Sequence, residues 1–152
     1  MAYGRSKGMP RPSLSLISHS NTPNSKPRED FKIVKTFKPS NLPGKTMIVG
    51  FVDIPPNGAS PSHRHGGAAI VAIPIEGSCL NQMNGNDPVV HNVGDFWYEA
   101  PGCHHQRSEN AGTGNSKFFA VLVVDDEAIK DGFGGIFVLD KEVEAGEKKA
   151  SI

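Results

Sequence analysis

The chain has 152 residues, of which 37% are hydrophobic and 21% charged, and its 16 Lys and Arg balance its 16 Asp and Glu. This length predicts a single domain that can bury a core without disulfides or structural metals. Zero net charge excludes a basic surface for duplex nucleic acid or an anionic membrane, and no apolar run is long enough to cross a bilayer. Two cysteines, Cys79 and Cys103, are too few for a disulfide scaffold and indicate a reducing compartment, so we expect a cytoplasmic protein.

Residues 1–30 are expected to form an irregular, basic N-terminal arm. Up to residue 28 this arm carries basic residues and no acid, and it is rich in serine and proline. Such a composition buries too little apolar surface to fold by itself. The domain that we expect to fold covers residues 31–140, and residues 141–152 are expected to be a charged tail in solvent.

Between the two ends the sequence predicts short strands separated by turns. Residues 31–37 (FKIVKTF) and 46–54 (TMIVGFVDI) are rich in β-branched and aromatic residues, and each run stops at turn-forming residues. Further strands are predicted over residues 68–75, 78–83, 89–92, 95–99, 104–109 and 117–125. Residues 126–131 are the only helix candidate, of a turn or two. This spacing predicts an all-β fold, an antiparallel sandwich or barrel, and not βαβ units.

Three of the six histidines form a candidate metal site. His63 and His65 are two residues apart, so on a strand both imidazoles project to one side. Imidazole suits Zn, Cu, Fe or Ni, and a third ligand can come from His104 or His105, which begin a later predicted strand. The alternative is that the first two histidines are surface or half-buried residues that bind no metal.

Two segments of the chain together resemble the two conserved motifs of the cupin superfamily. The first motif has Gly, His-x-His, Glu and Gly, and the second has Gly, Pro-x-Gly and His. The matching residues are Gly58, His63, His65 and Gly77 for the first motif, and Gly94, Gly102 and His105 for the second. Gly58 lies one residue closer to the histidines than usual, Ala100 stands in the proline position, and Pro101 comes one place late. The resemblance covers about residues 46–125 and implies a single jelly-roll barrel in which His63, His65 and His105 bind the metal.

The sequence departs from the first motif at its glutamate ligand. Ala69 and Ile70 occupy the positions where that glutamate would fall, and the nearest acid is Glu76. The ligands would then be three neutral histidines, as in the three-histidine iron site of the diketone-cleaving dioxygenases, which this site resembles. Such a site leaves positions open for an anionic oxygen chelator. We therefore expect Fe(II), with Zn, Mn, Ni or Cu as alternatives, while the rival interpretation is a lost or weakened metal site.

Glu99 is the predicted catalytic residue. It lies six residues before His105, and strand alternation places it on the same face as Trp97. In an apolar cavity the pKa of its carboxyl group would rise, which suits a general acid or base. The alternative is a structural ion pair with Arg107 or Arg64.

The remaining expectations concern the pocket and its surroundings. His104 is expected to point away from the site, because adjacent strand residues face opposite ways. Cys103 is expected to be a small buried hydrophobe. An apolar pocket with a few polar groups would suit a small hydrophobic or phenolic ligand. The residues predicted to line it are Gln82, Met83, Trp97, Arg107, Phe119 and Val121.

Three functions are consistent with these residues. The leading one is an O₂-dependent dioxygenase that acts on a small enolisable or phenolic compound chelated to the metal. The same site could instead support a non-oxidative isomerase, cyclase or decarboxylase, or a small-molecule-binding cupin without turnover. The resemblance also implies a homodimer, in which the arm, with Leu14, Leu16 and Ile17, could add a strand to the partner; simple disorder of the arm is the alternative.

Overall fold

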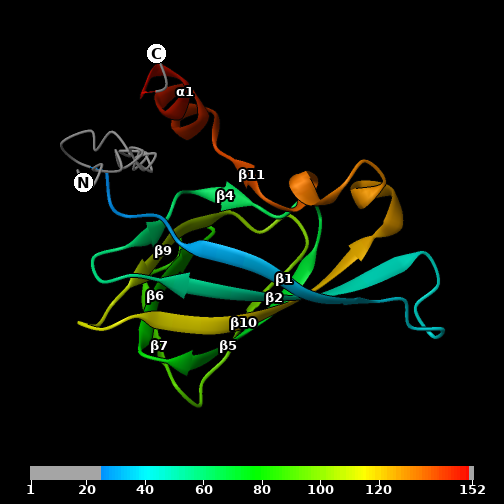
Figure 1. Ribbon diagram of the computed structural model, residues 1–152, viewed down its shortest axis with the longest axis horizontal. Helices are drawn as coiled ribbons and strands as arrows, with labels where there is room; N and C mark the ends of the chain where they lie inside the picture. The colour runs from blue at the N-terminus through cyan, green and yellow to red at the C-terminus, as the bar shows by residue number, and fades with distance from the viewer. Residues whose placement is uncertain (1–24, 151–152) are drawn as a thin grey trace, which may run out of the picture.

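The computed structural model describes residues 25–150, which form two antiparallel sheets packed face to face (Figure 1). Most of the predicted N-terminal arm, including Leu14, Leu16 and Ile17, lies outside the described residues. Residues 25–29 are irregular, and Asp30 already begins the first strand. The predicted all-β fold is confirmed.

The first sheet, here called sheet A, has five strands, and Figure 1 shows the four long ones side by side. All its neighbouring strands are antiparallel, and each corresponds to a predicted strand with shifts of a few residues at its ends. In spatial order they are β1 (Asp30–Phe37), β2 (Lys45–Ile54), β10 (Ser116–Asp125), β5 (Ala69–Glu76) and β8 (Trp97–Glu99).

The second sheet, here called sheet B, contains the strands predicted over residues 78–83, 89–92 and 104–109, together with several very short ones. The two-residue strands β3, β4 and β11 have too little alternation to be predicted from sequence. In spatial order the strands are β11 (Val138–Leu139), β4 (His63–Arg64), β9 (His105–Asn110), β6 (Ser78–Met83) and β7 (Val89–Asn92), and β3 (Ala59–Ser60) pairs with β9.

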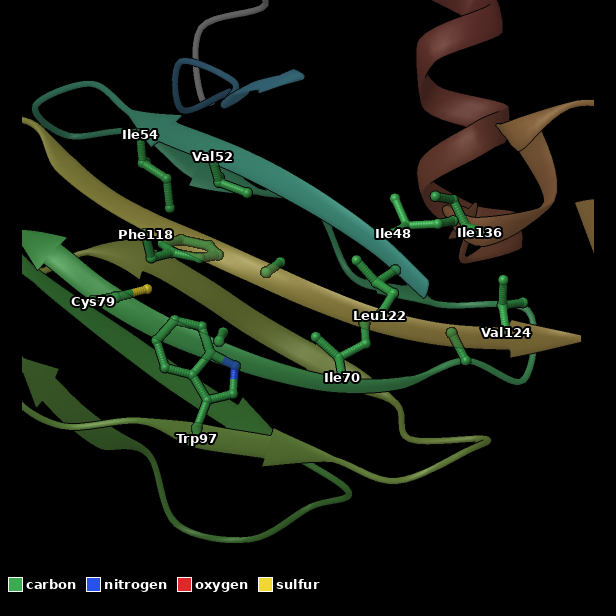
Figure 2. Packing of buried hydrophobic residues seen from close by; sticks show 13 residues of the cluster. Ile48, Val52, Ile54, Ile70, Cys79, Trp97, Phe118, Leu122, Val124 and Ile136 are labelled. Carbon is green, nitrogen blue, oxygen red and sulfur yellow. The ribbon is translucent and has the colours of Figure 1, made fainter. Parts of the chain in front are cut away.

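The core lies between the sheets and is supplied mainly by sheet A. Every second residue of β2 and β10 is buried, among them Ile48, Ile54 and Leu122. Figure 2 shows these side chains pointing into the same interior as Ile70 of β5 and the Trp97 indole of β8. This apolar packing provides the main stabilisation of a fold that has no disulfide among its described residues.

The chain after β10 differs from its prediction. The helix candidate is confirmed as a 3₁₀ helix, η1 (Asp126–Ile129), and a second one, η2 (Phe133–Ile136), precedes β11. The tail predicted to be a solvated segment instead forms helix α1 (Lys141–Ala150). The negative charges of Glu142 and Glu144 in its first turn interact favourably with the helix dipole. The sequence pattern did not predict this helix, because the segment shows no apolar stripe of helical period. Among the described residues, no helix is long and apolar enough to cross a membrane.

The segment from η2 to β11 folds back over the end of sheet B. Gly66 follows the histidine pair with a φ of 57°, and a Cβ there would lie 2.1 Å from the carbonyl oxygen of Gly135. Only glycine permits this close approach of the two backbones. β11 then pairs with β4, so Val138 faces Arg64 and Leu139 faces His63. The C-terminal segment is thereby held beside the candidate site.

Candidate metal centre and cavity

The three predicted histidine ligands meet at the inner side of sheet B. His63 of β4 and His105 of β9 are register partners, and both are buried, with 3% of their surface exposed. His65 lies two residues further on, and its Nε2 is 3.0 Å from the Nε2 of His63. Possible ligand atoms of all three side chains lie within 4.8 Å of one another. The three histidines that the spacing argument selected therefore lie close together.

Hydrogen bonds outside the cluster fix which nitrogen of each ring carries its proton. The Nδ1 of His63 lies 2.6 Å from the Pro61 carbonyl oxygen, and the Nδ1 of His65 lies 2.9 Å from that of Ile136. A carbonyl oxygen only accepts, so both Nδ1 atoms must donate and both Nε2 atoms carry a lone pair. In His105 the assignment is reversed, because Nε2 donates to Oδ1 of Asn81 at 2.7 Å.

These tautomers direct three lone pairs toward one point. Two acceptor nitrogens only 3.0 Å apart, those of His63 and His65, repel each other unless a cation lies between them. The Nδ1 of His105 is buried and has no hydrogen-bond partner among the described residues. Histidine ligands whose other nitrogen is held by a carbonyl or amide are the usual arrangement at metal sites. The donor set therefore fits a divalent transition metal.

The electrostatics of His63 favour the neutral ring that a metal ligand requires. Burial, followed by the field of His65, lowers the pKa of His63 from 6.5 to about 3. The ring of Phe137 stacks on His63 at a centroid distance of 4.2 Å and shields it from solvent. At neutral pH the ring is therefore unprotonated and available to a metal.

Glu99 reaches this cluster from sheet A. Its register partner on β5 is Ile70, the residue at the expected position of the missing glutamate ligand. Glu99 Oε1 lies 3.2 Å from the Nδ1 of His105, and Oε2 lies 3.2 Å from the Nε2 of His65. The indole N–H of Trp97 donates to Oε1 at 3.0 Å, whereas Oε2 is buried without a hydrogen-bond partner. A neighbouring strand thus supplies a carboxylate where the motif lacks one.

The expected rise in the pKa of Glu99 is wrong. Burial by itself raises this pKa, but a proton on the facing nitrogen of His105 or His65 outweighs burial and holds it below its ordinary value. The prediction considered an apolar cavity and not two imidazoles at 3.2 Å. The carboxyl group is therefore ionised at neutral pH.

The alternative roles considered for neighbouring residues are not supported. Arg107 pairs with Glu109, and Arg64 donates to the carbonyl of Gly102, so neither forms an ion pair with Glu99. His104 points away from the site, as predicted, and its Nε2 lies 2.8 Å from a carboxylate oxygen of Asp140.

A cavity of about 550 Å³, including its open mouth, adjoins the histidines. Its wall is mostly apolar and comes mainly from the inner face of sheet A. Its polar residues come from the side of sheet B, except for the carboxylates of Glu29 and Glu99. The lining residues are Glu29, Phe31, Val52, Ser60, His63, His65, Ile70, Ala72, Glu99, His105, Ser108, Phe118, Ala120, Leu122, Ile136 and Phe137.

None of the six residues predicted to line the pocket does so. On β10 the inward residues are Phe118, Ala120 and Leu122, so the prediction of Phe119 and Val121 was out of phase by one residue. Both faces of β10 are apolar, and the sequence therefore contains no polar alternation that fixes the phase. The other four side chains make different contacts. The Gln82 amide donates to the Asn86 carbonyl, and Met83 packs against the core. The buried Trp97 indole donates to Glu99, and Arg107 pairs with Glu109.

Several residues of the site were missed by the sequence analysis. Asn81 could have been found, because alternation from Cys79 along β6 places it on the inner face. No local signal marks Ile136 and Phe137, since they lie in a segment that reads as an irregular loop. Glu29 falls in the expected arm and was not considered.

Comparisons with known proteins agree with this architecture. A family model described as a cupin domain matches residues 50–124. No curated protein matches the sequence. The matched region covers 49% of one similar chain of known structure and 40% of another.

Three solved structures illustrate the likeness. An RmlC-like cupin with a double-stranded β-helix fold from Methanocaldococcus jannaschii is 14% identical over 75% of this chain and 91% of its own, with a TM-score of 0.51. An uncharacterized double-stranded β-helix protein from Klebsiella pneumoniae is 17% identical over 68% and 83%, with a TM-score of 0.53. The cupin domain of Cnp3 from Schizosaccharomyces pombe is 14% identical over 65% and 66%, also with a TM-score of 0.53. With its two-sheet fold and its motif residues, the chain belongs to the cupin superfamily.

Proposed function

We propose that this cupin is a metal-dependent enzyme that acts on a small enolisable or phenolic compound, and that its reaction is an O₂-dependent dioxygenation. The observation that carries the proposal is the convergence of three histidine lone pairs beside an apolar cavity. His63, His65 and His105 would hold the ion, and Fe(II) is the ion we propose. When bound, such an ion supplies a Lewis acid and positions open to a chelating enolate, catecholate or β-diketonate.

The cavity favours a ligand with one polar edge. Its apolar wall includes Ile70, Leu122 and Phe118 from sheet A, and the histidines face this wall from the side of sheet B. A ring or a conjugated diketone can place its carbon framework on that wall and direct its oxygens to the opposite side. The aromatic ring of Phe137 stacks on His63 and lines the same end of the cavity.

Glu99 is the residue that we propose to hold the proton of the docking substrate. Its Oε1 is fixed by the Trp97 indole, and its Oε2 is buried and unpartnered at the cluster. An ionised carboxylate in this position can accept the proton of an enol or phenol as the oxygen approaches the metal site. Oε2 is the atom at which that proton would be held.

Oxygen uptake tests the reaction. Protein loaded with Fe(II) is screened in an oxygen electrode against β-diketones and polyphenols, and uptake should require both metal and substrate. Substrate conversion without oxygen uptake would contradict the dioxygenase proposal and favour an isomerase, cyclase or decarboxylase. Metal and ligand binding without any turnover would instead favour a binding protein.

The Glu99→Gln variant tests the role of the carboxylate. It keeps the shape of the side chain and an acceptor for the Trp97 N–H, so the fold should be retained. We expect full metal content with turnover lowered by about 10²–10⁴-fold, the range typical of general acid–base catalysis. Loss of the metal in this variant would contradict the proton-acceptor role and identify Glu99 as a fourth ligand.

A further inference from the structure

A second buried carboxyl group, that of Glu29, faces the same cavity as the histidines. Its side chain is only 6% exposed, and its Oε1 lies 3.5 Å from the guanidinium of Arg28. Its Oε2 is buried and has no hydrogen-bond partner in the described part of the chain. A buried oxygen without a donor is costly, so this atom is suited to a donor that enters the cavity.

Glu29 lies at a different level of the cavity from the histidines. The N–H of Ala59 donates to the carbonyl of Pro27, so the segment that carries Glu29 runs beside β3. β3 in turn pairs with β9 at Ser108, three residues along that strand from His105. Three residues of extended chain span about 10 Å. The polar region around Glu29 and the one around the histidines therefore lie apart along the same cavity.

We propose that Glu29 forms a second subsite, which accepts a hydrogen bond from a hydroxyl or ammonium group at the end of the substrate remote from its chelating oxygens. This inference rests on the proposed function, because the histidines define the chelating end. Phe31 and Phe118 line the space between the subsites and provide apolar contact for the connecting ring. The substrate class becomes an enolisable or phenolic chelator with a hydrogen-bond donor at its far end.

Two β-diketones test the subsite, 1-phenylbutane-1,3-dione and its para-hydroxyphenyl analogue. Both are titrated into Fe(II)-loaded protein without oxygen, and binding is followed by absorbance. The wild type should bind the hydroxylated probe about tenfold more tightly, as expected for one hydrogen bond to a charged group. Glu29→Leu should abolish this preference while leaving metal content and the affinity for the unsubstituted probe unchanged.

The possible results separate this inference from the proposed function. Equal affinities for the two probes in the wild type, or a preference that survives in Glu29→Leu, would overturn the subsite even if the enzyme turns over diketones. If neither probe binds, phenol alone is titrated by NMR without metal. Phenol must then perturb the Glu29 carboxyl resonance, and the absence of that perturbation overturns the subsite independently of chelation.

Discussion

The two sheets of this cupin divide stability and chemistry between them. Sheet A is apolar on its inner face, through residues such as Ile48 and Leu122, and apolar again across the middle of its outer face. Sheet B carries His63, His105 and Asn81 on its inner face, and all three are at least 97% buried. These three side chains can be buried in sheet B because each makes at least one hydrogen bond and because sheet A supplies the apolar packing.

Glu99 is the exception that connects the two sheets. It is a buried carboxylate on β8, at the edge of sheet A, and it contacts histidines of sheet B. Its register partner is Ile70 of β5, the apolar residue at the position of the motif's glutamate. The acid on β8 therefore lies directly beside the position on β5 where the motif has its own acid. A carboxylate that the motif strand lacks is therefore present in space on the neighbouring strand.

The largest expected effect is the difference between the two sheets in how much a buried side chain contributes to the free energy of unfolding. Ile48→Ala removes a fully buried side chain from sheet A and should lower the free energy of unfolding by about 2–5 kcal/mol. Ser108→Ala, at a buried polar position of sheet B, should lower it by about 1 kcal/mol or less. Urea unfolding followed by circular dichroism measures both. Equal losses in the two variants would show that the sheets contribute alike.

An intermediate effect is expected for the support of the histidines. Asn81→Leu removes the acceptor for the Nε2 proton of His105, so the ring loses its fixed orientation. Such outer contacts typically change metal affinity by about 10–100-fold, and we expect a loss in that range by competition with a chelating dye. Gln82→Leu is the control, because the Gln82 amide bonds to the Asn86 carbonyl and not to the site. Unchanged affinity in Asn81→Leu would remove Asn81 from the metal centre.

The smallest effect concerns the charged outer side of sheet B. The hydrogen bond from Arg107, together with Lys26, lowers the pKa of Glu109 from 4.5 to about 2 against the opposing effect of burial. A lowered folded-state pKa contributes stability above pH 4.5, and that contribution disappears as the pH falls from 4.5 toward 2. The melting temperature of Glu109→Gln should therefore change less steeply than that of the wild type in this window. Identical slopes would mean that the pair contributes nothing.

The sequence predicted the parts of this structure that depend on local pattern. The long strands, the inward positions of Trp97 and Glu99 and the outward position of His104 all follow from alternation with a period of two. The three histidines were brought together by motif spacing. Their metal remains a prediction.

The parts that were not predicted depend on contacts between distant segments. The phase of β10 was wrong because Phe118 and Phe119 are equally apolar, and only packing against sheet B decides which one faces inward. The Ile136 carbonyl can accept a hydrogen bond from His65 because Gly66 lets the C-terminal segment approach the turn after the histidines. The lowered pKa of Glu99 likewise needs the positions of two imidazoles that come from other strands.

Metal stoichiometry tests the central claim most directly. The protein, purified without a histidine tag after growth with iron, manganese, nickel and zinc supplied together, is analysed by mass spectrometry for metal per chain. We predict about one divalent transition-metal ion in the wild type and in His104→Ala, whose ring points away from the site. His63→Ala and His105→Ala should each contain almost none. Metal that persists in both of these variants, or a wild type that binds none when any of the four ions is supplied, would contradict the account.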